Sequence, residues 1–285
     1  MTTKELAHDF IINYVNRRLA PSTARGYKTN IRLYILPLLG ERDVTTLTVF
    51  NLDDITETYK DDVSGTTLLY VHATFRKMLN YAVKRGYIVK NPYCMFDLPR
   101  KNKYKYRTLS IQERADLLRL CRCTPLEAPV FLALKYGLRR GEVLGLKVED
   151  IDTDSCIMHV QRSRGTENGK EVLTDCKTKD SDRYILLESL DARMLYFKGL
   201  GQPYVVNMSP AMLDKRYKAF LRSHGLPDIR FHDLRHSYAT YMLSRGVNPK
   251  IVSSVLGHSD VGITLDLYSH PDVSMQSVCL EANRI

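Results

Sequence analysis

A short polar and basic segment separates two regions of apolar patterning, and this division constrains the fold more than any other feature of the chain. The segment opens with Asn91-Pro92, a pair typical of turns and loops, and ends in a cluster of lysines and arginines. A chain of 285 residues can form two domains, each with its own core. We therefore predict one domain over residues 1–98, a basic linker over 99–107 and a second domain over 108–285.

The first region has helical periodicity. Apolar residues recur at steps of three and four positions from Leu68 to Ala82, and Gly86 then supplies a stop signal. An earlier helix begins near Ser22, and we expect Pro37 to end it because proline disrupts a helix interior. These patterns predict a helical bundle.

Helices also dominate the second region, where Ser110 and Glu113 form a capping-box pattern ahead of an apolar run. The exception is an interval with three short strand patterns, at residues 157–160, 171–173 and 183–186, separated by polar turns that contain glycine. The predicted fold class is therefore mainly α with a small antiparallel β-sheet, in two domains.

Composition indicates the kind of partner and the compartment. Lysine and arginine number 42 against 32 aspartate and glutamate residues, which favours a polyanionic partner such as nucleic acid. The first residues carry no signal-peptide pattern, and no apolar stretch is long enough to span a bilayer, so we expect a cytoplasmic protein. The six cysteines lack the spacing of a disulfide framework or a zinc site, and we predict neither.

Two local patterns point to phosphate. His232, Arg235 and His236 stand at positions i, i+3 and i+4 and would share one face of a helix, either as a solvated surface stripe or as an anion site. Arg139 lies at the expected start of a short helix, where a positive charge is unfavourable unless an anion binds there. Two arginines can bind a phosphodiester through paired hydrogen bonds.

Five short motifs follow one another in the second region. They are Tyr136–Glu142, Cys176–Lys179, His232–His236, Leu256–His258 and Leu267–His270. In that order and at those separations they resemble the tyrosine recombinase family of phage integrases, conjugative-transposon integrases and Xer-type recombinases. The resemblance extends over nearly the whole chain, because residues 5–98 are similar to the helical (SAM-like) core-binding domain of that family.

The resemblance implies a set of catalytic residues: Arg139, Lys177, His232, Arg235, His258 and Tyr268. The two arginines would hold the scissile phosphate, and Tyr268 would attack it to give a 3′-phosphotyrosine link. Lys177 would be the general acid, His232 the base and His258 a further donor, while Glu142 would support the site. We favour Lys177 over the nearby Lys179 from its position in the motif.

The resemblance also implies partners. The substrate would be double-stranded DNA with a specific site, enclosed by a clamp of the core-binding and catalytic domains. Predicted contacts to DNA are Arg25, Lys28, Arg32, Lys101, Lys103, Lys105 and Arg107. A homotetramer on DNA would exchange C-terminal segments, residues 272–285, between subunits, with a possible accessory directionality factor. The reaction keeps the phosphodiester energy in the covalent link, so no cofactor, metal or ATP is expected.

Three alternatives stay open from the sequence. A type IB topoisomerase would share the chemistry, a catalytically silent DNA-binding regulator could share the fold, and a helical protein-interaction module would not bind DNA. The full set of six residues favours the enzyme, in which integration or excision of a mobile element is the expected event. The core-binding pattern begins near residue 5, so we expect no separate arm-binding domain before it.

Overall fold

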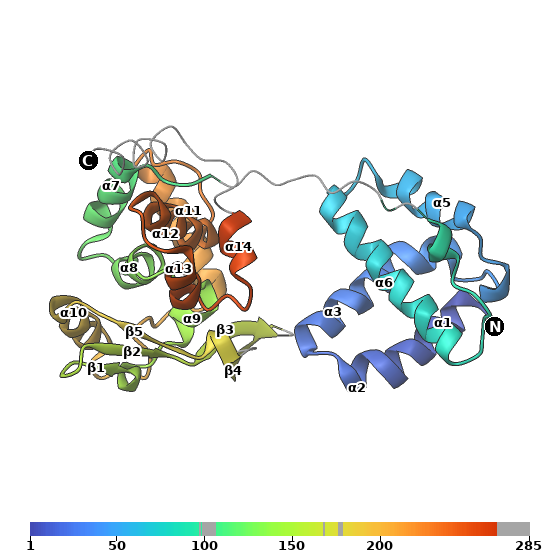
Figure 1. The fold of residues 1–285 in the computed structure, drawn as a ribbon, viewed down its shortest axis with the longest axis horizontal. Coiled ribbons are helices and arrows are strands. Elements are labelled where there is room, and N and C mark those ends of the chain that lie inside the picture. Colours follow the sequence, from blue (N-terminus) through green and yellow to red (C-terminus); the bar gives the residue numbers. More distant parts are fainter. Residues whose placement is uncertain (97, 99–106, 168, 176–178, 267–285) are drawn as a thin grey trace. The chain divides into compact units, whose positions relative to one another are not determined.

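The computed structural model describes residues 1–96, 98, 107–167, 169–175 and 179–266 (Figure 1). The chain forms two compact units, residues 1–104 and 105–285, which we call the N-terminal and C-terminal units. Each unit has its own hydrophobic core. In the part of the chain that the structure describes, none of the helices is both long and apolar enough to cross a membrane.

The N-terminal unit is helical in its described residues. Its helices are α1 (Thr3–Phe10), α2 (Asn16–Arg18), α3 (Pro21–Asn30), α4 (Leu36–Leu39), α5 (Val49–Tyr59) and α6 (Gly65–Lys84). Two π-helical turns, Ile11–Val15 and Ile31–Ile35, and two 3₁₀ turns, Val44–Thr46 and Pro92–Met95, connect them. The predicted periodicity of α6 is confirmed, because Leu68, Phe75 and the other apolar residues of that face are buried in the core.

Pro37 does not end the helix that begins near Ser22, so that prediction is wrong. The helical path continues from α3 through the π turn Ile31–Ile35 into α4, where Pro37 lies in the first turn. In the π turn the Leu36 amide donates to Ile31, five residues back. The Leu33 carbonyl, which would face the missing amide of Pro37, accepts from the Tyr59 hydroxyl at 3.3 Å.

The C-terminal unit combines helices and short strands. Its helices are α7 (Ile111–Cys121), α8 (Glu127–Lys135), α9 (Arg140–Gly145), α10 (Ser189–Gly199), α11 (Pro210–Ser223), α12 (Phe231–Ser244), α13 (Pro249–Leu256) and α14 (Val261–Asp266). The 3₁₀ turns are Val148–Asp150 and Lys179–Ser181. Ser110 and Glu113 form the predicted capping box at the start of α7. The mainly helical fold with antiparallel strands is as predicted.

The strands form two antiparallel sheets in place of the single sheet that we expected. The first has the order β1 (Ile151–Asp152), β2 (Ile157–Val160), β5 (Arg183–Leu186), and the second pairs β3 (Arg162–Glu167) with β4 (Lys170–Asp175). Residues 171–173 therefore pair with β3 and not with the other two predicted strands. The sequence of β3 is polar throughout, so no apolar alternation marked it as a strand.

Close packing fixes the β3–β4 hairpin against α9. A Cβ atom added at Gly145 would lie 3.1 Å from the Arg162 carbonyl oxygen, and one at Gly141 would collide with the Ser163 side chain. On the other side, the Arg164 guanidinium donates to the carbonyls of Val206 and Met208 at 3.0 and 2.6 Å. The hairpin is thus held beside the helix that follows Arg139.

Candidate active site

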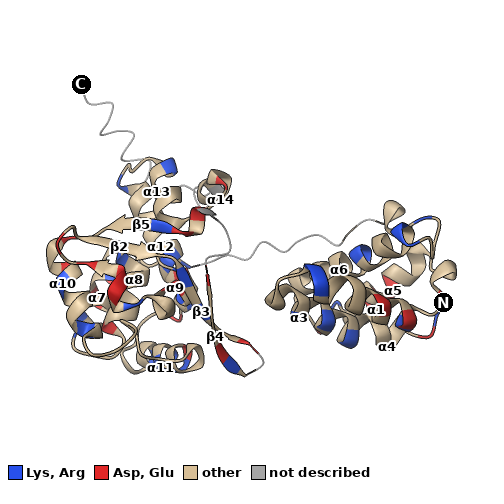
Figure 2. Ribbon diagram, turned by 90° about the horizontal axis from the view of Figure 1, so that it is seen from below, with Lys and Arg blue, Asp and Glu red and all other residues tan. Residues whose placement is uncertain are grey.

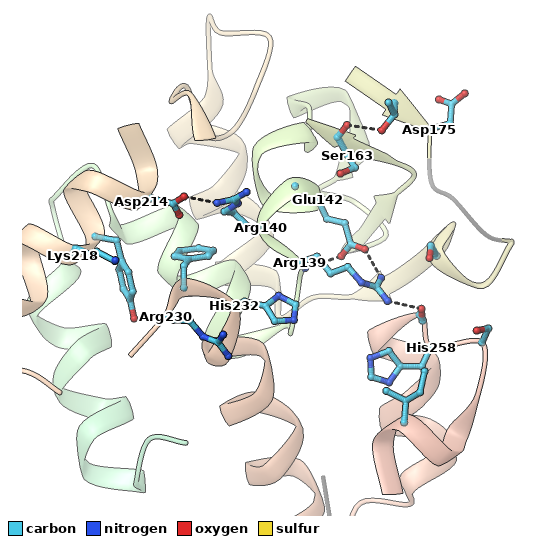
Figure 3. A pocket seen from close by; sticks show the side chains of 18 residues that line it. Arg139, Arg140, Glu142, Ser163, Asp175, Asp214, Lys218, Arg230, His232 and His258 are labelled. Carbon is cyan, nitrogen blue, oxygen red and sulfur yellow. Dashed lines mark hydrogen bonds and ion pairs between the residues drawn. The ribbon is translucent and has the colours of Figure 1, made fainter. Parts of the chain in front are cut away.

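A cavity of about 870 Å³ lies in the C-terminal unit, where α9, the β3–β4 hairpin, α11, α12 and the end of α13 meet (Figure 3). Of the predicted catalytic residues, Arg139, His232 and His258 line it. They come from three separate segments, and Figure 3 shows their side chains around the same space. The structure therefore brings together residues that are up to 119 positions apart in the sequence.

Arg139 immediately precedes α9 and is held on two sides. Its guanidinium donates to a Glu142 carboxylate oxygen at 2.7 Å and to the Gly257 carbonyl at 2.9 Å, and its backbone amide donates to the other Glu142 oxygen at 2.9 Å. The carboxylate thus offsets the positive charge that the sequence placed at the helix start. The Arg139 side chain is still one-third exposed and faces the cavity.

Arg235 lies behind the cavity wall. Its side chain is only 3% exposed and is not among the lining residues. Two of its donors are used by the carbonyls of Gly137 and Leu256, at 2.7 and 2.6 Å, which leaves three N–H groups of the guanidinium for other partners. Burial, with the neighbouring Arg139, lowers the pKa of Arg235 to about 9, so it remains protonated at neutral pH.

Glu142 is the buried centre of this region. Burial raises the pKa of its carboxyl, but Arg183, Arg139 and Arg235 outweigh that effect and hold the pKa at about 2. One carboxylate therefore lies among three arginines, and the cluster carries an excess of positive charge suited to an anion. The expected supporting contact between Glu142 and Arg139 is present.

Arg183 was not predicted as part of the site. It donates to Glu142 at 2.9 and 3.3 Å from β5 and is buried. A signal for it did exist in the sequence, because Arg183 alternates with Ile185 and must share the inward face of the strand.

The site histidines are neutral at neutral pH. Partial burial, followed by the charge of Arg235, lowers the pKa of His232, which lies in the first turn of α12. The same two causes lower the pKa of His258 to about 4. His236 lies one helical turn after His232, with ring centroids 5.0 Å apart, and burial with this neighbour lowers its pKa to about 4. Neutral rings can accept a proton or donate one hydrogen bond.

His258 is placed by a helix stop and a hydroxyl. Gly257 ends α13 in the left-handed conformation, with φ of 65°, as the glycine signal predicted. The Nδ1 atom of His258 lies 2.9 Å from the Oγ1 atom of Thr264, which is fully buried in α14. Sequence reasoning did not identify Thr264, because nothing distinguishes it from other helix threonines until α14 folds back against α13.

Lys177 and Tyr268 lie outside the described residues. Their flanks, however, adjoin the cavity: Asp175 and Ser181 line it on either side of the segment 176–178, and Ile263 of α14 lines it shortly before residue 268. Strand β4 ends at Asp175, and Lys179 begins a 3₁₀ turn. Lys179 therefore lies in a turn and not in strand β4.

Further cations line the other half of the cavity. Arg140 forms an ion pair with Asp214 of α11, and Arg230 donates twice to Asp233, each time at 2.9 Å. Lys218, one turn after Asp214, also lines the space. The cavity thus offers basic groups beyond those around Arg139.

Of the predicted DNA contacts, Arg25, Lys28 and Arg32 are exposed and recur at helical spacing along α3 and the following π turn. Arg107 is half exposed and paired with Glu113 at 2.8 Å. Lys101, Lys103, Lys105 and the predicted exchange segment 272–285 lie outside the described residues. Figure 2 shows lysines and arginines on the helices of both units. Within the described residues, no group of histidine, cysteine or acidic side chains could hold a metal ion.

Comparisons with known proteins agree with this architecture. The model of the phage integrase family matches residues 109–275. A XerC-like tyrosine recombinase of Caldanaerobacter subterraneus subsp. tengcongensis is 29% identical over 95% of this chain and 79% of its own. The Tn1549 transposon integrase in complex with transposon right end DNA shares the fold, with a TM-score of 0.84 at 18% identity over all of both chains. A lambda integrase tetramer bound to a Holliday junction gives a TM-score of 0.72 at 16% identity, over 91% of this chain and 78% of the other.

Proposed function

Since the chain belongs to the phage integrase family and is a site-specific tyrosine recombinase, we propose that it cleaves duplex DNA with Tyr268 as the nucleophile. The product would be a 3′-phosphotyrosine link and a free 5′ hydroxyl. The biological event that we propose is integration or excision of a mobile element.

One observation carries the assignment of residues. Arg139, His232 and His258 line a single cavity, and the segments on both sides of residue 177 and just before residue 268 line it too. The chain thus lines the cavity at Asp175, two positions before Lys177, and at Ile263, five positions before Tyr268. A cavity with an excess of buried arginine charge would accept a phosphodiester between these groups.

In the first step the Tyr268 hydroxyl oxygen bonds to phosphorus and the bond from phosphorus to the 5′ oxygen breaks. His232 accepts the tyrosine proton, and Lys177 donates a proton to the leaving 5′ oxygen. The lowered pKa of His232, caused by burial and by Arg235, supports its role as the acceptor because it favours the neutral ring. Rejoining runs the same transfers in reverse, with a 5′ hydroxyl of another strand as the nucleophile.

Arg139, Arg235 and His258 would stabilise the negative charge that develops on the non-bridging oxygens. Arg139 would act from the cavity side and Arg235 through the donors that its two carbonyl partners leave unused. A neutral His258 whose Nδ1 atom accepts from Thr264 carries its proton on Nε2, where it can donate to a phosphate oxygen.

The N-terminal unit would contact the DNA backbone through Arg25, Lys28 and Arg32, whose exposure supports that role. The basic linker 99–107 would join the two units into a clamp around the duplex. We further propose that strand exchange takes place in a homotetramer, with segment 272–285 docking on a neighbouring subunit. The lambda integrase tetramer on a Holliday junction, which has the same fold, supports this assembly.

The decisive experiment uses nicked suicide duplexes made from the DNA that flanks the protein's own coding sequence. Denaturing electrophoresis should detect a covalent adduct with the wild type and none with Tyr268→Phe, which removes one hydroxyl. Tyr184→Phe, a change at an exposed tyrosine outside the cavity, is the matched control. An adduct that persists in Tyr268→Phe would refute the nucleophile assignment and direct attention to Tyr238 and Tyr241.

A further inference from the structure

Three consecutive carbonyl groups at the end of α13 each accept a hydrogen bond from a different arginine. Val255 accepts from the Nε atom of Arg183 at 2.5 Å, Leu256 from Arg235 at 2.6 Å and Gly257 from Arg139 at 2.9 Å. The last carbonyls of a helix have no partner within the helix, so side chains must satisfy them when they are buried. The three arginines that surround Glu142 therefore also fix the helix end that precedes His258.

Arg183 differs from the other two in how many of its donors the protein occupies. Its side chain is 7% exposed and, like that of Arg235, does not line the cavity, but it makes four hydrogen bonds to protein groups where Arg235 makes two. The N–H groups of Arg183 donate to the Glu142 carboxylate, to the Val255 carbonyl and, at 3.0 Å, to the Ser181 carbonyl. One guanidinium thus joins β5, α9, α13 and the turn Lys179–Ser181.

The contact with Ser181 links this network to the segment that carries Lys177. The turn Lys179–Ser181 follows directly after residues 176–178, and it also packs tightly on the end of α13. A Cβ atom added at Gly257 would lie 2.7 Å from the Asp180 carbonyl oxygen, which leaves no room for a side chain there. Arg183 is the side chain whose hydrogen bonds hold both the turn and the helix end.

We propose that Arg183 is a positioning residue for DNA cleavage. It fixes the turn Lys179–Ser181 and the end of α13 to Glu142, and thereby sets the position of His258 relative to Arg139. This inference rests on the proposed function, which assigns Lys177, His258 and Arg139 to the reaction. A planar guanidinium is required because it serves a carboxylate and two carbonyls in different directions, which an ammonium group cannot do in the same geometry.

The test measures adduct formation in single turnover at saturating duplex DNA, together with the Kd for that DNA. Arg183→Ala should slow cleavage about a hundredfold, the cost of a small misplacement of reacting groups, while the Kd stays unchanged. Added guanidinium ion should restore part of the rate by occupying the vacated space. Arg183→Lys should remain slow, and Arg193→Ala, which removes an exposed arginine of α10, should match the wild type.

A wild-type rate in Arg183→Ala would overturn the proposal. So would a loss of affinity as large as the loss of rate with no recovery in guanidinium, because that pattern describes general structural damage. If Arg183→Ala does not fold at the assay temperature, Arg183→Lys decides by the same two measurements. A wrong nucleophile assignment would appear separately, as an adduct in Tyr268→Phe whose formation still depends on Arg183.

Discussion

The two units bury different kinds of polar side chain. Among the residues that the structure describes, the buried polar groups of the N-terminal unit are uncharged, whereas every buried Arg, Asp and Glu side chain belongs to the C-terminal unit. The former are Thr3, Asn30, Asn51, His72, Thr74 and Asn91, and the latter are Arg114, Glu142, Asp150, Arg164, Arg183, Asp233 and Arg235. Of these buried charges, Glu142, Arg183 and Arg235 belong to one cluster with Arg139 beside the cavity.

In the N-terminal unit the buried polar groups have uncharged hydrogen-bond partners, such as backbone carbonyls, hydroxyls and amides. The Asn30 amide donates to the Thr74 hydroxyl at 2.9 Å, and the two ring nitrogens of His72 lie 2.9 Å from the hydroxyls of Thr56 and Tyr93. Burial lowers the pKa of His72 to about 4, so the ring is neutral. Matched neutral pairs of this kind fix the packing of helices without leaving a net charge inside.

In the C-terminal unit the charges around Glu142 do not cancel. Three arginines face one carboxylate, and backbone carbonyls of α13 take part of the remaining hydrogen bonds. Burying unmatched charge destabilises a protein, so such an excess is retained where a ligand will complete it. In the function that we propose, the phosphodiester would supply the missing negative charge.

Glu142→Gln should have the largest effect of the changes that test this difference between the units. The change leaves three buried arginines without their carboxylate and should lower the free energy of unfolding by about 3–5 kcal/mol, the usual cost of removing one member of a buried ionic network. Asn30→Ala in the N-terminal unit, which loses a neutral hydrogen bond, should cost about 1 kcal/mol. Urea unfolding of the full chain measures both, and equal costs would contradict the distinction between the units.

Arg139→Ala and Arg235→Ala should have the next largest effect, on cleavage. Each should slow adduct formation about a hundredfold or more, the scale for losing one donor to a developing oxyanion. Arg140→Ala removes the same charge one position from Arg139, and because Asp214 already pairs with Arg140 its effect should be smaller. Single-turnover rates give the comparison, and an equal loss in Arg140→Ala would show that the arginine motif is misplaced by one residue.

Sequence reasoning succeeded where a local pattern determines structure. Helix α6 has one apolar face, and successive side chains of β2 and β5 alternate between buried and more exposed positions. Periodicity therefore predicted these three elements. The polar strand β3 was missed because its partner and the glycines of α9, not its own residues, make it a strand. Position in the motifs predicted the cavity residues Arg139, His232 and His258 but not Arg183, whose role depends on contacts 41 and 72 positions away.

The buried His72 and the partly buried His258 give the smallest test of the difference between the units. His72 and His258 both have a pKa lowered to about 4, His72 by burial alone and His258 by burial together with Arg235 and Arg139. An unfolded histidine titrates near 6.5, so between pH 6.5 and 4 the unfolded chain binds protons that the folded chain does not, and stability falls as the pH falls. His72→Leu and His258→Leu should each remove part of that slope, about 2 kcal/mol between pH 7.5 and 5.

Duplex DNA should then distinguish the two histidines. A bound phosphate favours the protonated form of His258 and raises its pKa, so the destabilising slope that His258 contributes should shrink or reverse in saturating DNA. His72 is enclosed by Thr56 and Tyr93 within the N-terminal core and has no path to the phosphate, so its slope should persist. Urea unfolding of wild type and both variants, with and without DNA at each pH, measures this. An equal response of the two slopes to DNA would show that the low pKa of His258 reflects burial alone, as in His72, and not a site awaiting an anion.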